Sequence, residues 1–182
     1  MRREPTRAAW SGEDHHGKQA TLEALVQDGL RDIGYAERKA LRGLRKMARG
    51  VNADEFHAAF ETHREEAEGQ IQRFQPVFGT ICKRAQGKTC AAIDGIQEEA
   101  EEVMEEYKDS PALDAGLLAA SQVIEHYEIT RYGTLASWAD QLGHADAASL
   151  LRETLAEEVR TDELLTQLAW NAINAAAEQP AT

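Results

Sequence analysis

Apolar side chains recur at intervals of three and four residues along four long segments of this sequence. That spacing matches one turn of an α-helix, so each segment is expected to form a helix with one buried face. The segments cover about residues 21–49, 52–76, 110–141 and 146–176. Only four prolines interrupt the chain, and its 182 residues suit one domain. The sequence therefore predicts an all-α protein.

The connections between these segments predict how the helices pair. Gly50 and Gly143 lie in very short connections, where a glycine can end one helix just before the next begins. A longer link over about residues 83–109 joins the two hairpins and contains a shorter amphipathic piece near 93–107. Two tight hairpins joined by one crossover with a short fifth helix match a ferritin-like four-helix bundle.

Local signals refine the expected helix ends. Asn52, followed three residues later by Glu55, resembles a capping box that starts the second helix. Ser110 predicts a cap for the third long helix, with Pro111 at its first position. Pro76 is expected to kink or end the second helix, because proline cannot donate the helical hydrogen bond.

The ends of the chain lack this periodicity. Residues 1–19 predict a disordered N-terminal tail, whose adjacent His15 and His16 are not expected to form a metal site. Residues 20–176 are the predicted bundle, and residues 177–182 are a C-terminal tail. No stretch of about 18 apolar residues and no apolar leader is present, so we expect a cytoplasmic protein without a membrane contact.

Charge and cysteine content narrow the functional classes further. The net charge of −12 argues against nucleic-acid binding. The basic run within residues 38–49 is interpreted as one solvated helix face, with a phosphate-binding stripe as the alternative. Cys82 and Cys90 lack the neighbouring ligands of a zinc site, so we expect two free, reduced thiols.

Acids and a histidine occupy positions on the apolar stripes where a packed core would place leucine or alanine. The predicted set is Glu37, His63, Glu66, Glu125, Glu128, Glu158 and Asp162. Glu37 and His63 lie at equal distances on either side of Gly50, as do Glu128 and Glu158 around Gly143. Residues equidistant from a tight turn share one level of an antiparallel hairpin, so these side chains are expected to meet.

Buried carboxylates need compensation, because an unpaired charge in a core costs several kcal/mol. Two divalent ions, iron or manganese, would supply it through carboxylate and imidazole ligands. Asp32 is the alternative to Glu37 in the first helix, and Gln70 is expected beside the site. The other interpretation is a metal-free network in which the acids and His63 share protons and Arg131 or Arg160 supplies countercharge.

Four stretches carry a resemblance to a known family. They lie at residues 32–37, 63–71, 125–135 and 157–162, and together they resemble the YciE/YciF family of bacterial ferritin-like stress proteins. The layout is more distantly similar to rubrerythrins, but the second helix has the order His63-x-x-Glu66, and the fourth has Asp162 without histidine. These departures weaken any transfer of a ferroxidase or peroxidase mechanism.

The resemblance implies a stress-related role, for which two functions stand open. One is a di-metal oxidoreductase that acts on a small oxidant or on a metal ion as substrate, with Glu128 and Glu158 as bridging ligands. The other is a non-catalytic, partner-binding bundle whose metal, if bound, is structural. We expect a homodimer in either case.

Overall fold

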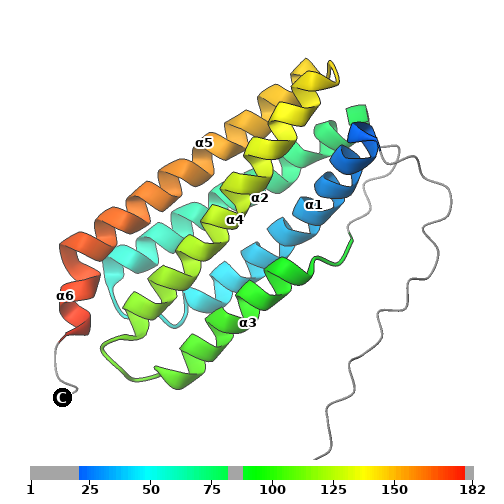
Figure 1. Ribbon diagram of the computed structural model, residues 1–182. Helices are drawn as coiled ribbons and strands as arrows, with labels where there is room; N and C mark the ends of the chain where they lie inside the picture. The colour runs from blue at the N-terminus through cyan, green and yellow to red at the C-terminus, as the bar shows by residue number, and fades with distance from the viewer. Residues whose placement is uncertain (1–20, 82–87, 179–182) are drawn as a thin grey trace, which may run out of the picture.

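The computed structural model describes residues 21–81 and 88–178, and the regular structure in these ranges is entirely helical. The helices are α1 (Leu22–Met47), α2 (Asp54–Ile81), α3 (Ala91–Glu106), α4 (Leu113–Gln141), α5 (Ala145–Leu168), a π-helical turn (Ala169–Ile173) and α6 (Asn174–Ala177). Figure 1 shows α1, α2, α4 and α5 as four long, nearly parallel rods with α3 beside them. The predicted all-α bundle with a short fifth helix in its crossover is confirmed.

Some predictions fall on residues outside the described ranges. These are the tail at residues 1–19 with its two histidines, Cys82, and the last residues of the chain from 179 onward. In the part of the chain that is described, no helix combines the length and the hydrophobicity of a membrane span.

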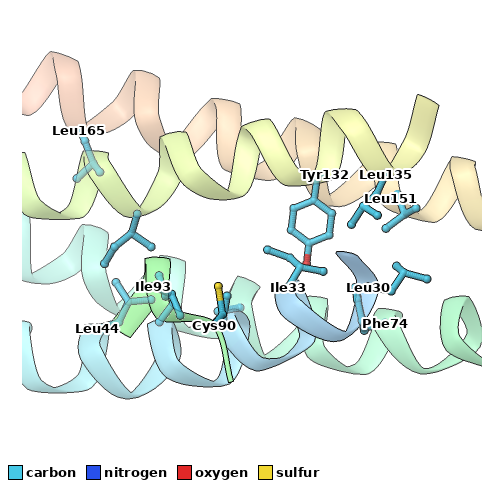
Figure 2. Packing of buried hydrophobic residues seen from close by; sticks show 14 of the residues in the cluster. Leu30, Ile33, Leu44, Phe74, Cys90, Ile93, Tyr132, Leu135, Leu151 and Leu165 are labelled. Atoms are coloured by element: carbon cyan, nitrogen blue, oxygen red, sulfur yellow. The ribbon is translucent and has the colours of Figure 1, made fainter. Parts of the chain in front are cut away.

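The four long helices form a closed ring of contacts. α1 packs on α2, α2 on α5, α5 on α4 and α4 on α1, while α3 covers the outer seam between α1 and α4. Short turns close the α1–α2 and α4–α5 hairpins, and Gly143 adopts a φ of 80°, which favours glycine. The buried stripes meet along the axis, where Figure 2 shows Tyr132 pointing from α4 toward Ile33 of α1. This arrangement brings the polar positions of all four stripes into one interior.

The expected start of the third long helix is wrong, and Pro76, expected to kink or end the second helix, does not end it. α2 continues through Pro76 to Ile81, because burial of Val77 and Phe78 on the next turn outweighs one missing backbone hydrogen bond. α4 begins at Leu113 rather than at Pro111. The Ser110 hydroxyl accepts a hydrogen bond from the Ala112 amide at 3.1 Å, so it forms the turn that precedes the helix.

The start of α2 is capped by another helix and not by the expected capping box. The carboxylate of Asp114, at the beginning of α4, accepts hydrogen bonds from the Asn52 amide at 2.9 Å and the Ala53 amide at 2.8 Å. These bonds satisfy backbone donors that a helix start leaves unpaired. They also tie the α1–α2 hairpin to α4 near the end of the bundle.

Helix α3 is fixed to α1 by complementary charges and a close approach. Asp94 accepts a hydrogen bond from the Tyr35 hydroxyl at 2.8 Å and pairs with Lys39 at 2.8 Å. A Cβ atom added at Gly43 would lie 2.1 Å from the side-chain oxygen of Gln97, so any other residue there would force the buried Gln97 side chain to move. Part of the basic run on α1 is therefore used in ion pairs within the bundle.

Candidate metal centre

Five polar side chains converge in the interior of the bundle. Glu37 comes from α1, His63 from α2, Glu125 and Glu128 from α4, and Glu158 from α5. Each lies on the buried stripe of its helix, and all five are buried. Each of the four long helices thus contributes at least one side chain that can coordinate a metal ion through an oxygen or nitrogen atom.

Three of these side chains are close enough to bind one ion together. One ligand atom from each of His63, Glu125 and Glu158 lies within 4.8 Å of the other two. The shortest approach joins His63 Nε2 to Glu125 Oε1 at 3.1 Å. Imidazole nitrogen with carboxylate oxygen is a donor set that iron, manganese and zinc accept.

The carboxylates of this group are poorly satisfied by the protein. Among the described residues, both oxygens of Glu158, Oε2 of Glu125 and Oε1 of Glu128 have no hydrogen-bond partner, and Oε1 of Glu125 faces only Nε2 of His63 at 3.1 Å. A buried polar atom without a partner costs about 1–3 kcal/mol. Oxygen atoms left open toward one another fit a divalent cation, which would neutralise them together.

Burial also changes the protonation of the acids. It raises the pKa of Glu128 and of Glu158 well above the usual range, and the charges of neighbouring carboxylates add to this effect. The pKa of Glu37 rises to about 7, again mainly through burial. Without metal, the raised pKa values favour protons at positions that a cation could take, as the interpretation of a metal-free network expects.

His63 responds in the opposite way to its acidic surroundings. Burial alone would lower its pKa, but the charge of Glu125 and hydrogen bonds with Glu125 and Glu66 raise the pKa to about 10. A metal ion at Nε2 would have to displace this proton.

A tyrosine holds the acid of α1. The buried hydroxyl of Tyr132, on α4, donates a very short hydrogen bond to Oε1 of Glu37. Burial and the nearby charge of Glu37 raise the pKa of Tyr132 well above its usual range, so it remains a donor. The bond fixes one oxygen of Glu37 and links α1 to α4.

The second nitrogen of His63 faces the seam between α2 and α5. Nδ1 lies 3.4 Å from the Thr161 hydroxyl and 3.9 Å from Oε2 of Glu66. The Glu66 side chain is 36% exposed, so this predicted ligand lies at the rim of the site and not inside it. Such contacts on the far nitrogen orient a histidine for a ligand at Nε2.

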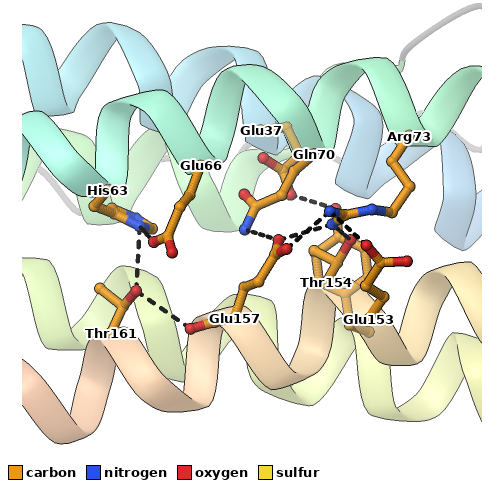
Figure 3. A network of polar contacts seen from close by, with 10 residues as sticks. Glu37, His63, Glu66, Gln70, Arg73, Glu153, Thr154, Glu157 and Thr161 are labelled. Atoms are coloured by element: carbon orange, nitrogen blue, oxygen red, sulfur yellow. Dashed lines mark hydrogen bonds and ion pairs between the residues drawn. The ribbon is translucent and has the colours of Figure 1, made fainter.

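A polar network closes the next stretch of the same seam, as Figure 3 shows. Arg73 of α2 donates two hydrogen bonds to the carboxylate of Glu157 on α5, at 2.7 and 2.8 Å, and one to Thr154 at 2.9 Å. The buried amide of Gln70 donates to Glu157 at 3.1 Å. Sequence reasoning placed Gln70 beside the site but missed the roles of Arg73 and Glu157. α2 and α5 share no turn, so the sequence offers no register for this seam.

Two other candidate ligands lie away from the converging group. Asp162 accepts a hydrogen bond from Gln122 at 3.0 Å and lies 3.4 Å from Nε2 of the exposed His126, on the outer side of the α4–α5 pair. Asp32, the alternative to Glu37, pairs with Lys88 at 3.5 Å, next to the start of α3. Between the two α1 acids, the structure therefore brings Glu37 to the interior.

The remaining groups discussed for the site lie outside it. Arg131 stacks on the ring of Tyr127, with its guanidinium 5.2 Å from the ring centre, and therefore does not face the buried acids as a countercharge. Cys90 carries a free, buried thiol 3.1 Å from the Tyr127 hydroxyl. The Arg131 contact lies within α4, and the Cys90 contact joins the residue before α3 to α4.

Comparison with known proteins shows a family model and a curated relative that each match most of this chain. A family model described as a domain of unknown function, DUF892, matches residues 21–178. Protein YciF of Escherichia coli (strain K12) is 43% identical over 162 residues, which cover 88% of this chain and 98% of YciF.

Solved structures give the same result. The crystal structure of the E. coli stress protein YciF matches with a TM-score of 0.81 at 43% identity, over 86% of this chain and 99% of that one. YcfI of Rhodopseudomonas palustris, whose description proposes a structural role, matches with a TM-score of 0.78 at 40% identity, over 80% and 93% of the two chains. A Xanthomonas campestris protein, XCC3681, matches at 19% identity with a TM-score of 0.68 over 86% and 96%, which concerns the fold alone.

Proposed function

This chain belongs to the DUF892 family of YciF-type stress proteins, and on that basis we propose that its bundle core holds a di-metal centre that reacts with a small oxidant. The metals would be iron or manganese, which favour mixed carboxylate and imidazole ligands. Peroxide, dioxygen or ferrous iron itself would be the substrate.

One observation carries the proposal, namely the cluster of buried carboxylate oxygens that have no partner in the described protein. Glu125, Glu158 and His63 would hold one ion, since their ligand atoms already lie together. Glu128, with one unpaired oxygen, and Glu37 would complete the second position. Bound iron or manganese would supply one-electron redox chemistry, which these side chains lack.

The protein's own residues prepare the site in three ways. Tyr132 holds one oxygen of Glu37 by a hydrogen bond, so that the carboxylate keeps a fixed direction. Thr161 approaches Nδ1 of His63 and leaves Nε2 directed at the centre. The apolar residues around the five polar groups exclude water, which strengthens every electrostatic interaction there.

Elemental analysis tests the proposal directly. We expect about two iron or manganese ions per chain in untagged protein purified without chelator, as in other carboxylate sites of ferritin-like bundles. A Glu128→Ala, Glu158→Ala double variant should lose them. A matched double variant at exposed positions of the same helices, Thr130→Ala with Glu163→Ala, should keep them.

The opposite outcome has an equally clear meaning. Wild-type protein without metal, with a melting temperature that added iron or manganese does not change, would refute the di-metal centre. The acids of the core would then form a proton-sharing network.

A non-catalytic role is the second candidate, and the structural role proposed for the R. palustris relative favours it. In that case metal would only hold the four helices together. Chelation would lower the melting temperature strongly, while the metal-loaded protein would consume neither peroxide nor ferrous iron.

Assembly is a separate part of the proposal. We expect a cytoplasmic homodimer, and sedimentation velocity tests the association state. A species at the 20.1 kDa mass of one chain, unchanged over a wide concentration range, would refute dimerisation.

A further inference from the structure

A small internal cavity adjoins the candidate metal centre. It lies between α2, α4 and α5, and His63 and Glu125 form its polar end. Ala59 and Phe60 of α2 and Leu164 and Leu165 of α5 line its apolar part. Its volume of about 10 Å³ is roughly the space that one water-sized molecule needs.

The two ends of this cavity differ in polarity and in their exposure to solvent, which suggests a route for a small molecule from solvent to the core. Glu125 is fully buried, and its Oε2 has no hydrogen-bond partner among the described residues, while Oε1 contacts only Nε2 of His63. At the other end Leu164 is 41% exposed and Ala59 is partly exposed. Only a thin apolar wall therefore separates solvent from the buried carboxylate.

Elsewhere the same seam is closed by charged groups. Beyond Glu66, the paired side chains of Arg73 and Glu157 bridge α2 and α5, with Gln70 hydrogen-bonded beneath them, as Figure 3 shows. A molecule that entered there would have to break a two-point ion pair. The apolar end beside Ala59 and Leu164 presents no such bond.

We propose that this cavity is the port through which a small neutral oxidant reaches the centre. An ion would lose its hydration against leucine and phenylalanine side chains, dioxygen would lose almost none, and neutral hydrogen peroxide would give up hydrogen bonds to water but no charge solvation. The cavity has room for about one water-sized molecule, so dioxygen or hydrogen peroxide would pass with small side-chain movements, whereas an organic hydroperoxide would require repacking of the core. The substrate class is thus hydrogen peroxide or dioxygen.

The port has a catalytic role only if the core binds metal, so this inference rests on the proposed function. Access itself is measurable without metal. Dissolved dioxygen is paramagnetic and shifts the methyl resonances that it approaches. In metal-free protein under oxygen pressure, the methyl groups of Leu165 should shift several-fold more than those of Leu151, which is equally buried on the same helix and lies outside the cavity. Equal shifts would overturn the port.

A kinetic experiment on iron-loaded protein tests the route. In the assay, hydrogen peroxide takes two electrons and two protons to become two waters, with one electron from each of two ferrous ions. Ala59→Leu should slow this oxidation about tenfold at unchanged iron content, since the added methylenes fill the port. Ala58→Leu, at the exposed neighbouring position, should react as the wild type does.

The outcomes separate the two proposals. Wild-type oxidation by hydrogen peroxide that is much faster than by cumene hydroperoxide supports the port, and dioxygen in the same assay identifies the preferred oxidant. Equal rates for wild type and Ala59→Leu would overturn it. Failure to bind either iron or manganese would refute the di-metal centre, and the oxygen shifts of the metal-free protein would then decide access alone.

Discussion

Replacing Glu158 by methionine should stabilise the metal-free protein. This side chain is fully buried, and neither of its oxygens has a partner in the described structure. Burial and the charges of Glu128 and Glu125 raise its pKa, so the fold favours the protonated form of this side chain. Removing an unsatisfied buried group recovers about 1–3 kcal/mol. Methionine has a similar volume and fits with little strain.

Chemical and thermal unfolding of chelator-treated protein measure this gain. In a domain of this size each kcal/mol changes the melting temperature by about 2–4 °C, so an increase of about 2–12 °C is expected. Metal binding should be lost in the same variant. Glu37→Met is the matched control, because it leaves the Tyr132 hydroxyl without its acceptor and should bring no gain.

A metal-free Glu158→Met protein that is less stable than the wild type would contradict this reasoning. It would mean that Glu158 is already compensated in the absence of metal, by shared protons or by the charge on His63. The argument that these acids are retained for a cation would then fail.

Three further perturbations have defined outcomes. The pKa of Glu37 in the folded protein is about 7, above the usual 4.5, so folding favours its protonated form. The stability that this gives is complete below pH 4.5 and is lost as the pH rises through 7. The melting temperature of the metal-free wild type should therefore fall over this pH range relative to that of Glu37→Gln. Gly43→Ala should lower the free energy of unfolding by about 1–3 kcal/mol through its clash with Gln97, whereas Gly95→Ala, where a Cβ meets nothing, should raise it by about 0.5–1 kcal/mol in the same denaturation assay. Asp114→Ala should cost about 1–2 kcal/mol and increase hydrogen exchange at the Asn52 and Ala53 amides just before α2, and unchanged exchange there would argue against the cap.

Much of the fold followed from two local features of the sequence. The spacing of apolar residues predicted four long helices, and the short connections at Gly50 and Gly143 predicted two hairpins. The errors arose where distant contacts outweigh local preference. Pro76 lies within a helix because the residues after it are buried. The backbone just before α2 is hydrogen-bonded to the carboxylate of Asp114 on α4, a contact that no local sequence pattern could reveal.

The polar interior was predictable for the same reason as the hairpins. A tight turn fixes the register of its two helices, so counting from Gly50 related Glu37 to His63, and counting from Gly143 related Glu128 to Glu158. The structure brings these four side chains together with Glu125. Their ligation of metal stays a prediction.

The sequence by itself determined which helix faces are buried and which levels of each hairpin coincide. Only the tertiary structure decided which acids turn inward. Side chains three or four residues apart on a helix point in directions that differ by about 60° or 40°. Glu66 and Asp162 therefore lie on the same helix faces as His63 and Glu158, but their carboxylates stay at the edges of those faces and not in the interior. The α2–α5 seam, with its Arg73–Glu157 pair and the cavity beside it, joins helices that no turn connects. Its register is set by packing of the whole bundle, because no local spacing encodes it.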